Sequence, residues 1–341
     1  MKKKIYAFLG MAVLTIVLLF LYDRIKSNKN ESLSKYDFAM GTSVSVVTYG
    51  EKHDKLENTN NEIVDLIKYY DEKVLSWRSD SSELANLNKN DSMMMSKELE
   101  PAVKKSYAVC EDSEGALDIT LRPVLNVWNI EQATNESFTI PDEDAIEDAI
   151  NKTGYKNIII DENNISLKND VIIDLGSTAK GYILDVCYDA LKDKDIYGAI
   201  VTAGGSVMVF GSKDDKSEWK IGIRNPKGNE GDMIGYLSFN DNQKHCVSTS
   251  GNYEKYFIVD GVRYHHIIDP KTGYPAKSGL SSVTVISEDG LYSDALSTAC
   301  YVLGYEKSLP LLEKYDAQAV FIDNENNIYM TSGAKKLFVK Q

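Results

Sequence analysis

Apolar and polar residues alternate along this chain with two different periods. Residues 42–49 alternate at every second position, which indicates a strand, whereas residues 59–77 repeat apolar side chains every three to four positions, which indicates a helix. Further helical patterns cover residues 97–110, 179–191, 292–303 and 307–315. Strand patterns cover residues 158–161, 165–167, 171–175, 199–202, 207–210, 219–224, 235–239, 256–259, 262–268 and 281–286, and a closing hairpin covers 319–330. Helices mixed with mainly antiparallel strand pairs, without a regular βαβ series, predict an α+β fold of mixed sheets with packed helices.

The N-terminal segment has a different pattern. Lys2, Lys3 and Lys4 precede an apolar run over residues 5–22 that contains no charge. As a helix with ~1.5 Å per residue, this run would span roughly 27 Å, which suffices for a thin bilayer. Lysines before such a run hold its N-terminus on the cytoplasmic side. We therefore expect residues 1–26 to be a transmembrane helix that anchors a single-pass protein in the cell membrane.

Two other interpretations compete with an anchor. A cleaved signal peptide has the same order of charged and apolar residues but ends in a small-residue site, which residues 21–26 lack. A buried helix of a soluble protein would show an amphipathic pattern, which the run also lacks. With an anchor, residues 27–36 form a polar linker to the membrane and residues 37–341 form one extracytoplasmic domain.

Composition and charge limit the partners of that domain. The 341 residues are 43% hydrophobic, enough to bury a sizeable core, and their formal net charge is −13. The first 30 residues hold six Lys or Arg and one Asp, so the rest of the chain has a formal charge of −18. Such a charge argues against nucleic acid and against docking on anionic lipid. A phosphate ligand would need a local site, in which a divalent metal supplies positive charge.

The four cysteines do not point to a metal centre. Cys110, Cys187, Cys246 and Cys300 are widely separated and lack the spacing of zinc ligands. Their even number permits disulfides, but their spacing equally fits four thiols in the core. We favour core thiols.

A first candidate for chemistry is the segment 174–182, in which an apolar strand pattern runs into a Gly-rich turn and then a helix. Backbone N–H groups at a helix N-terminus suit phosphate, and Lys180 would add a positive charge. The segment matches neither G-x-x-x-x-G-K-[ST] nor G-x-G-x-x-G. By itself it is equally typical of a tight connection between strand and helix.

A second candidate is the segment 265–275, which contains two of the four histidines of the chain. A strand would deliver His266 and Asp269 to a Pro-Lys-Thr-Gly turn, where polar side chains can face a cleft. The alternative is an ordinary hydrogen-bonded histidine on a strand.

A third candidate lies in the predicted helix 292–303. Asp294, Ser297 and Thr298 share one helix face, so that a carboxylate and two hydroxyls point to one place. Such oxygen ligands suit Mg²⁺, which also expects phosphate oxygens and water. The alternative is a helix N-cap, with Ser293 or Asp294 binding free N–H groups.

The order of these segments resembles the ApbE family of FAD:protein FMN transferases. The likeness begins at Met40-Gly-Thr and continues through 75–88, 115–120 with Pro123 and Trp128, 174–185, Gly204-Gly205, 266–273 and 294–304. It extends from Met40 to about Leu337. Each segment alone is unspecific, whereas their ordered occurrence is not. Two positions depart from the usual family pattern, with Trp77 where Tyr is common and Leu117 where Phe is usual.

The resemblance implies an FAD site and a metal site. It places Trp77 against a ring of FAD, in agreement with the large π faces of flavin and adenine. The implied FAD-binding residues are Met40, Trp77, Ala116, Leu117, Asp118, Gly176, Tyr182 and Ile268. The implied Mg²⁺ ligands are Asp294, Thr298 and Ser297, together with the backbone carbonyl of Ala179.

The resemblance also implies a reaction. A Thr or Ser hydroxyl of an acceptor flavoprotein, from an extracytoplasmic electron-transfer system, attacks the FMN-side phosphorus of FAD, and AMP leaves. We expect His266 to be the base, with Asp269 or Asp118 as alternatives and Lys180 as a charge near the phosphates. Two other functions stay open at this point: an FAD pyrophosphatase, and a surface protein that binds flavin without turnover.

Overall fold

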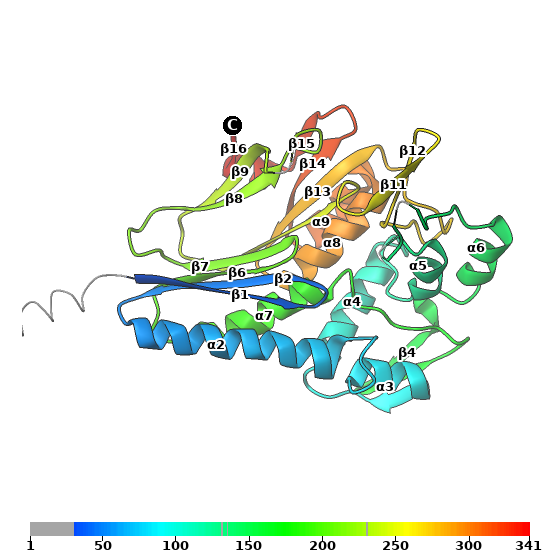
Figure 1. Cartoon of the computed structure of the whole chain (residues 1–341), viewed down its shortest axis with the longest axis horizontal. Coiled ribbons are helices and arrows are strands. Elements are labelled where there is room, and N and C mark those ends of the chain that lie inside the picture. The colour runs from blue at the N-terminus through cyan, green and yellow to red at the C-terminus, as the bar shows by residue number, and fades with distance from the viewer. Residues whose placement is uncertain (1–30, 131, 135, 230) are drawn as a thin grey trace, which may run out of the picture.

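The structure, a computed structural model, describes residues 31–130, 132–134, 136–229 and 231–341. The anchor expected over residues 1–26 lies outside this part of the chain. None of the helices within the described residues is both long and apolar enough to cross a membrane. The described residues form a central sheet with helices on one face and a smaller sheet on the other (Figure 1).

The central sheet has eight strands, each antiparallel to its neighbours. Val44 and Val46 alternate with less buried residues in its second strand, as the sequence pattern predicts, because only one face of that strand is covered along its whole length. Every residue of the strand Leu280–Ser287 is buried, because both faces of the sheet are covered there. In spatial order the strands are β1 (Glu31–Ala39), β2 (Thr42–Gly50), β6 (Gly198–Ala203), β7 (Ser206–Gly211), β10 (His245–Gly251), β13 (Leu280–Ser287), β14 (Gln318–Asp323) and β15 (Ile328–Met330).

Helices cover one face of this sheet. Ile63 and Ile67 pack with Ile183 and Leu184 against the buried side of β2 and β6. Such burial of apolar helix faces contributes roughly 1.5–3 kcal/mol for each large side chain. The covering helices are α2 (His53–Tyr69), α4 (Glu100–Asp112), α7 (Ala179–Leu191), α8 (Gly290–Leu303) and α9 (Tyr305–Lys314).

A three-stranded sheet packs on the opposite face. Its order is β16 (Phe338–Lys340), β9 (Met233–Phe239) and β8 (Trp219–Arg224), so β8 forms one edge. The Trp219 ring lies 5.5 Å from the ring of Tyr49, between the centroids, and this contact joins β8 to β2. The short helix α10 (Ser332–Leu337) closes the same core.

The remaining elements lie around one end of the central sheet. The hairpin β11 (Tyr256–Val259) and β12 (Val262–His265) packs on a cluster of aromatic residues that includes Trp128 and Phe138. The other elements are η1 (Tyr70–Leu75), α3 (Glu83–Asn90), β3 (Ser92–Met94), α5 (Arg122–Trp128), α6 (Glu143–Ile150), η2 (Tyr155–Asn157), β4 (Ile158–Asp161) and β5 (Asn164–Leu167).

The α+β class with mainly antiparallel strands is confirmed, although several segments differ from the prediction. Residues 31–36, expected as part of a polar linker, belong to β1 and pair with β2 along their whole length. Residues 171–175 are buried but belong to no strand. The central strand β10 was not predicted, because its sequence His-Cys-Val-Ser-Thr-Ser-Gly lacks an apolar alternation.

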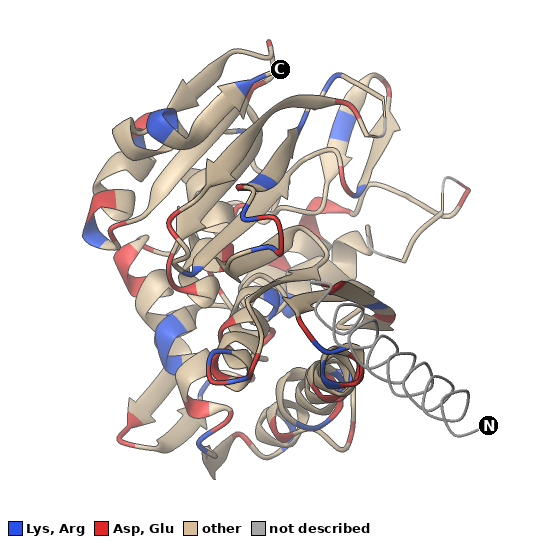
Figure 2. Ribbon diagram, turned by 90° about the vertical axis from the view of Figure 1, so that its left-hand side faces the viewer, with Lys and Arg blue, Asp and Glu red and all other residues tan. Residues whose placement is uncertain are grey.

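The four cysteines are free thiols in the interior, as one of the two alternatives from the sequence requires. Burial raises the pKa of each thiol above its ordinary value. Acidic and basic residues are interspersed over the helices and outer strands of the described chain (Figure 2). Its negative charge is therefore spread over many elements.

His265 gives the fold a dependence on pH. Its Nε2–H donates to the Ala276 carbonyl (3.1 Å) and its Nδ1 accepts from the Ile267 N–H (3.3 Å), so the ring is held neutral. Burial lowers the pKa of His265 from 6.5 to about 4. The unfolded chain binds a proton near pH 6.5 and the folded chain does not, so this group destabilises the fold as pH falls below 6.5.

We expect His265 to cost about 2 kcal/mol of unfolding free energy between pH 7 and pH 5. Urea unfolding of the full chain at both pH values measures this loss. In His265→Gln, whose amide can still donate to the Ala276 carbonyl, the loss should be smaller by about that amount. An equal loss in both proteins would show that other groups cause the pH dependence.

Candidate active site

One cavity of about 770 Å³ lies where the central sheet, the small sheet and the helices α7 and α8 meet. Its lining comes from the β1–β2 turn, the segment after η1, the segment 116–125, the turn before α7, β8, the β10–β11 connection and α8. Twelve of the site residues expected from the sequence line it: Met40, Trp77, Ala116, Leu117, Asp118, Gly176, Ala179, Lys180, His266, Ile268, Asp294 and Thr298. Segments far apart in the sequence thus meet at one place.

Three expected site residues are not part of this lining. The Tyr182 hydroxyl donates to the Glu98 carbonyl (2.7 Å), away from the cavity. The Asp269 carboxylate accepts from the Lys271 N–H (2.9 Å) within its own turn. Ser297 is a buried residue of α8, and its hydroxyl donates to the Asp294 carbonyl (2.8 Å). These three residues can therefore hold neighbouring lining residues in place, but they do not themselves face the cavity.

Met40 enters the cavity from a tight hairpin turn. Met40 and Gly41 both have positive φ values, 54° and 70°, as the two central residues of such a turn require. A non-glycine residue in this conformation needs support, and the Met40 N–H donates to Asp71 Oδ2 (2.5 Å). Asp71 comes from η1, whose wider winding is itself often found at functional sites. The sequence did not reveal Asp71, because it falls within an ordinary helical pattern.

Trp77 is held by cations. The Arg122 guanidinium carbon lies 4.2 Å from the centroid of the Trp77 ring, and that of Arg78 lies 4.8 Å away. Arg122 is buried and donates from Nε to Asp174 Oδ2 (2.7 Å), so its own position is fixed. The indole is therefore held in place against an ion pair at the cavity wall. Arg122 was not expected from the sequence, in which its only signal is a charged residue directly before Pro123.

Asp118 has its oxygens already engaged. It accepts from the Thr120 N–H (2.8 Å), the Thr120 hydroxyl (2.6 Å) and the Tyr155 N–H (3.0 Å). Burial raises the pKa of Asp118, while these hydrogen bonds oppose that shift. Because its oxygens already accept three hydrogen bonds, Asp118 suits a role in shaping the cavity wall and not a role as the base.

Asp294 lies at the contact of α7 with α8. Its Oδ2 accepts from the Gly181 N–H (2.9 Å) at the start of α7, and its Oδ1 accepts from the Ser206 hydroxyl (3.2 Å). Burial raises the pKa of Asp294, although Lys180 Nζ, 4.0 Å from Oδ2, lowers it. A buried carboxylate with one distant cation favours an additional cation beside it.

The oxygens around Asp294 fit a hard divalent cation. The Asp294 oxygens accept from the Gly181 N–H and the Ser206 hydroxyl, and the Thr298 hydroxyl lines the same cavity. The Thr298 hydroxyl lies 3.1 Å from that of Ser250. Within the described residues, no cluster of three or more His, Cys, Asp or Glu side chains could hold a metal. A cation here would depend on one carboxylate, hydroxyls, carbonyls and ligand oxygens, as Mg²⁺ commonly does.

Two glycines bring α7 and α8 into backbone contact at this point. A Cβ on Gly181 would lie 2.0 Å from the Gly290 carbonyl oxygen, and a Cβ on Gly290 would lie 2.3 Å from the Gly181 carbonyl oxygen. Asp185 fixes the same contact, because it accepts from the Gly290 N–H (2.7 Å) and from Lys244 Nζ (2.5 Å). This close approach sets the distance between Lys180 and Asp294.

His266 lies on the other side of the cavity, directly after β12. Its backbone N–H donates to the Lys255 carbonyl (3.1 Å), and its Nδ1 lies 3.3 Å from the same oxygen. A carbonyl only accepts, so Nδ1 is the protonated nitrogen in the neutral ring, and Nε2 is the basic one. The histidine is thus oriented as a proton acceptor.

Comparison with known proteins gives a consistent result. The ApbE family model matches residues 40–322. The FAD:protein FMN transferase of Treponema pallidum is 32% identical over 321 residues, which cover 88% of this chain and 87% of that protein. The FAD:protein FMN transferase of Klebsiella pneumoniae is 31% identical over 306 residues, covering 88% and 92%.

Solved structures agree with the sequence relatives. The crystal structure of the ApbE protein from Thermotoga maritima has a TM-score of 0.79 and 34% identity, and the match covers 90% of this chain and 99% of that one. The flavin transferase ApbE from Vibrio cholerae has a TM-score of 0.79 and 26% identity, with 91% and 100% covered.

Proposed function

This chain belongs to the ApbE family, and from that premise we propose that its cavity binds FAD and transfers FMN to a hydroxyl of an acceptor protein. One observation supports this function above the others. A buried carboxylate, Asp294, a cation, Lys180, and an oriented histidine, His266, open onto one cavity that also contains the aromatic face of Trp77. FAD needs an aromatic contact, charge compensation at its pyrophosphate and a base for the incoming hydroxyl.

The residues of this chain divide the reaction between them. Trp77, Met40, Leu117 and Ile268 would hold the rings of FAD. Lys180 would compensate pyrophosphate charge, and Asp294 and Thr298 would hold Mg²⁺ beside the pyrophosphate. Bound Mg²⁺ would supply charge neutralisation for the phosphate that departs, which is the main requirement of phosphoryl transfer.

The bond changes follow from this arrangement. The oxygen of an acceptor Thr or Ser hydroxyl bonds to the FMN-side phosphorus, and the phosphorus–oxygen bond to the AMP phosphate breaks. The hydroxyl proton passes to Nε2 of His266 and AMP leaves with the bridging oxygen. The product is FMN joined to the acceptor through a phosphate ester.

The cellular setting is a further part of the proposal. The lysines at positions 2–4 and the uncharged run 5–22 support a membrane anchor with the domain outside the cytoplasm. The acceptor would then be a flavoprotein of an extracytoplasmic electron-transfer system. Protease treatment of intact cells should remove the domain if this setting is right, and leave it intact if the domain is cytoplasmic.

Turnover separates the enzyme from a protein that only binds flavin. The full chain is incubated with FAD, Mg²⁺ and the membrane fraction of its own cells, which supplies the acceptor, and the AMP formed above an incubation without the chain is measured by chromatography. We expect AMP to form, and to stop forming when EDTA is added. FAD that stays intact while bound would contradict the proposal and favour the binding protein.

We expect His266→Ala to lower FMN transfer about a hundredfold, because no other oriented base would receive the hydroxyl proton. The binding of FAD, followed by flavin fluorescence, should change little. Asp269→Asn is the matched control three residues away, because Asp269 does not line the cavity and should leave transfer nearly unchanged. Unchanged transfer in His266→Ala would remove His266 from the mechanism.

A further inference from the structure

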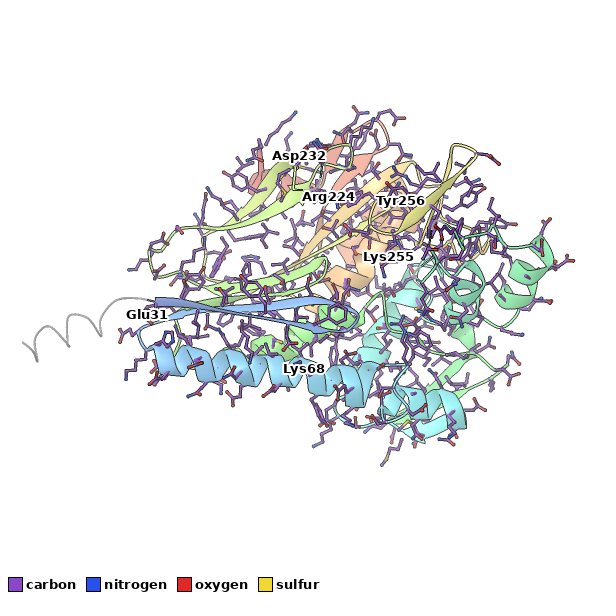
Figure 3. The ribbon with its side chains drawn as sticks, in the orientation of Figure 1. Glu31, Lys68, Arg224, Asp232, Lys255 and Tyr256 are labelled. Carbon is purple, nitrogen blue, oxygen red and sulfur yellow. The ribbon has the colours of Figure 1, made fainter. Side chains whose placement is uncertain are left out.

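The cavity has a second side that the FAD and metal residues do not account for. Ile221, Gly222 and Arg224 of β8 line it, and they come from the three-stranded sheet, which supplies none of Met40, Trp77 and Asp294. In Figure 3, Arg224 and Lys255 lie on the side of the small sheet and the β11–β12 hairpin. If the first side holds FAD, the second side is where another reactant can approach.

The strand β8 has an edge without a neighbouring strand. Within the described residues β8 pairs with β9 alone, and it is the last strand of its sheet. Ile221 and Ile223 are buried, whereas Lys220 and Gly222, which alternate with them, are exposed. Gly222 has no side chain to keep another backbone away. Such an edge is a template for an additional strand.

Two exposed aromatic residues lie on the neighbouring face of the central sheet. Tyr36 is 74% exposed and Phe38 is 68% exposed, and both come from β1, the last strand of the central sheet. Phe38 pairs with Ser43 of β2, which lines the cavity. Ser32 points to the same side of β1 as Tyr36 and Phe38, and it pairs with Tyr49 of β2. The Tyr49 ring contacts Trp219 of β8. The face with Tyr36 and Phe38 is therefore the face toward β8.

These two features form one surface, which we call the acceptor surface: the unpaired edge of β8 together with Tyr36 and Phe38 of β1. The surface is continuous with the cavity, because Ser43 beside Phe38 and Gly222 of β8 both line it. Figure 1 shows β8 above the strands β1 and β2. A strand added to β8 would lie over the exposed aromatic rings and lead into the cavity.

We propose that the acceptor surface binds an extended segment of the acceptor protein, which pairs with β8, covers Tyr36 and Phe38, and delivers its Thr or Ser into the cavity. This inference rests on the proposed transfer to a protein. Backbone pairing would supply affinity, contacts of alternate side chains would supply specificity, and the aromatic face would supply contact area. A second copy of the chain and the segment before β1 are the other possible occupants.

The first test removes the aromatic face. The full chain carrying Tyr36→Ser and Phe38→Ser is given FAD, Mg²⁺ and synthetic peptides of about a dozen residues, each with a single central Thr and randomised flanks. Covalent flavin on the peptides should fall at least tenfold. The binding of FAD, followed by flavin fluorescence, should be unchanged, because neither residue lines the cavity.

A matched control replaces two exposed apolar residues elsewhere. Met94 (71% exposed) and Ile159 (40% exposed) lie in the sheet of β3, β4 and β5, away from the acceptor surface. Met94→Ser with Ile159→Ser should label peptides like the unchanged chain. An equal loss in both pairs would overturn the assignment of Tyr36 and Phe38, because it would reflect general surface polarity.

The second test examines the backbone pairing. The best-labelled peptide is resynthesised with one N-methyl group at each position in turn, which removes one N–H donor at a time. Pairing with one strand edge predicts losses at every second position, because alternate N–H groups of a strand point to the same side. Losses without this alternation, or no loss, would overturn the proposal.

The remaining outcomes separate this inference from the proposed function. If a protein of the cells' membrane fraction is labelled but no peptide is, the acceptor segment is not recognised as an extended chain and the inference fails alone. If AMP forms but neither protein nor peptide is labelled, the chain is a hydrolase and both fail. A dimer of the unchanged chain that dissociates in the Tyr36→Ser, Phe38→Ser protein would assign the surface to a second copy instead.

Discussion

Asp294→Asn is expected to lower AMP release from FAD about a thousandfold, with no loss of stability in the absence of metal. The carboxylate is the only acidic side chain of the proposed metal site, so its removal takes away the main charge that holds Mg²⁺. The Asn amide oxygen can still accept from the Gly181 N–H or from the Ser206 hydroxyl, which preserves part of the local hydrogen bonding. Steady-state AMP release at saturating FAD measures the effect.

The stability of the same variant separates a metal ligand from a structural residue. Burial raises the pKa of Asp294, because folding without a metal disfavours the charged form of this carboxyl. Without metal, Asp294→Asn should therefore unfold at the same or a higher temperature than the unchanged chain. Added Mg²⁺ should raise the unfolding temperature of the unchanged chain and not that of the variant. A variant that unfolds earlier in EDTA would contradict this assignment.

Gly181→Ala is expected to destabilise the fold by about 3 kcal/mol and to abolish measurable turnover. The new methyl group would lie 2.0 Å from the Gly290 carbonyl oxygen and 2.6 Å from Asp294 Cβ, so α7 and α8 would have to separate. Both neighbours belong to backbone or to a short, fixed side chain, which cannot turn away. The movement would take Asp294 from the Gly181 N–H and from Lys180. Chemical unfolding and AMP release measure the two losses.

A second glycine provides the control for an added methyl group. A Cβ on Gly222 would lie 2.7 Å from Met233 Sδ, but that Met side chain is 45% exposed and can rotate. Gly222→Ala should therefore leave the unfolding free energy nearly unchanged. Equal destabilisation in Gly181→Ala and Gly222→Ala would contradict a specific backbone contact between α7 and α8.

The sequence pattern was sufficient to predict the strands and helices that are buried on one face only. Strand β2 alternates because only one of its faces is covered along its whole length, and α2 has an apolar stripe because it lies on the sheet. Strand β10 could not be found this way. Its Ser248 and Ser250 turn toward hydroxyls of α8, so polar residues occupy a buried central strand. Strand β1 was missed because its outward positions are exposed and its N-terminal half is polar.

The candidate site was only partly accessible from the sequence. Its separate segments could be identified, but the separation between Lys180, Asp294 and His266 in space depends on the packing of α7 on α8 and on the hairpin β11–β12. Arg122 was missed because its role depends on two distant partners, Trp77 and Asp174. Such contacts depend on tertiary structure, and the spacing of residues within one segment of the sequence does not predict them.

Mass spectrometry of the acceptor can show whether the cavity joins FMN to a protein hydroxyl. The full chain is incubated with FAD, Mg²⁺ and the membrane fraction of its own cells, and tryptic peptides that carry covalent flavin are sequenced. Transfer predicts a Thr or Ser bearing FMN as a phosphate ester, formed in step with AMP and absent with Asp294→Asn. AMP accompanied only by free FMN would contradict this transfer and show that water is the acceptor.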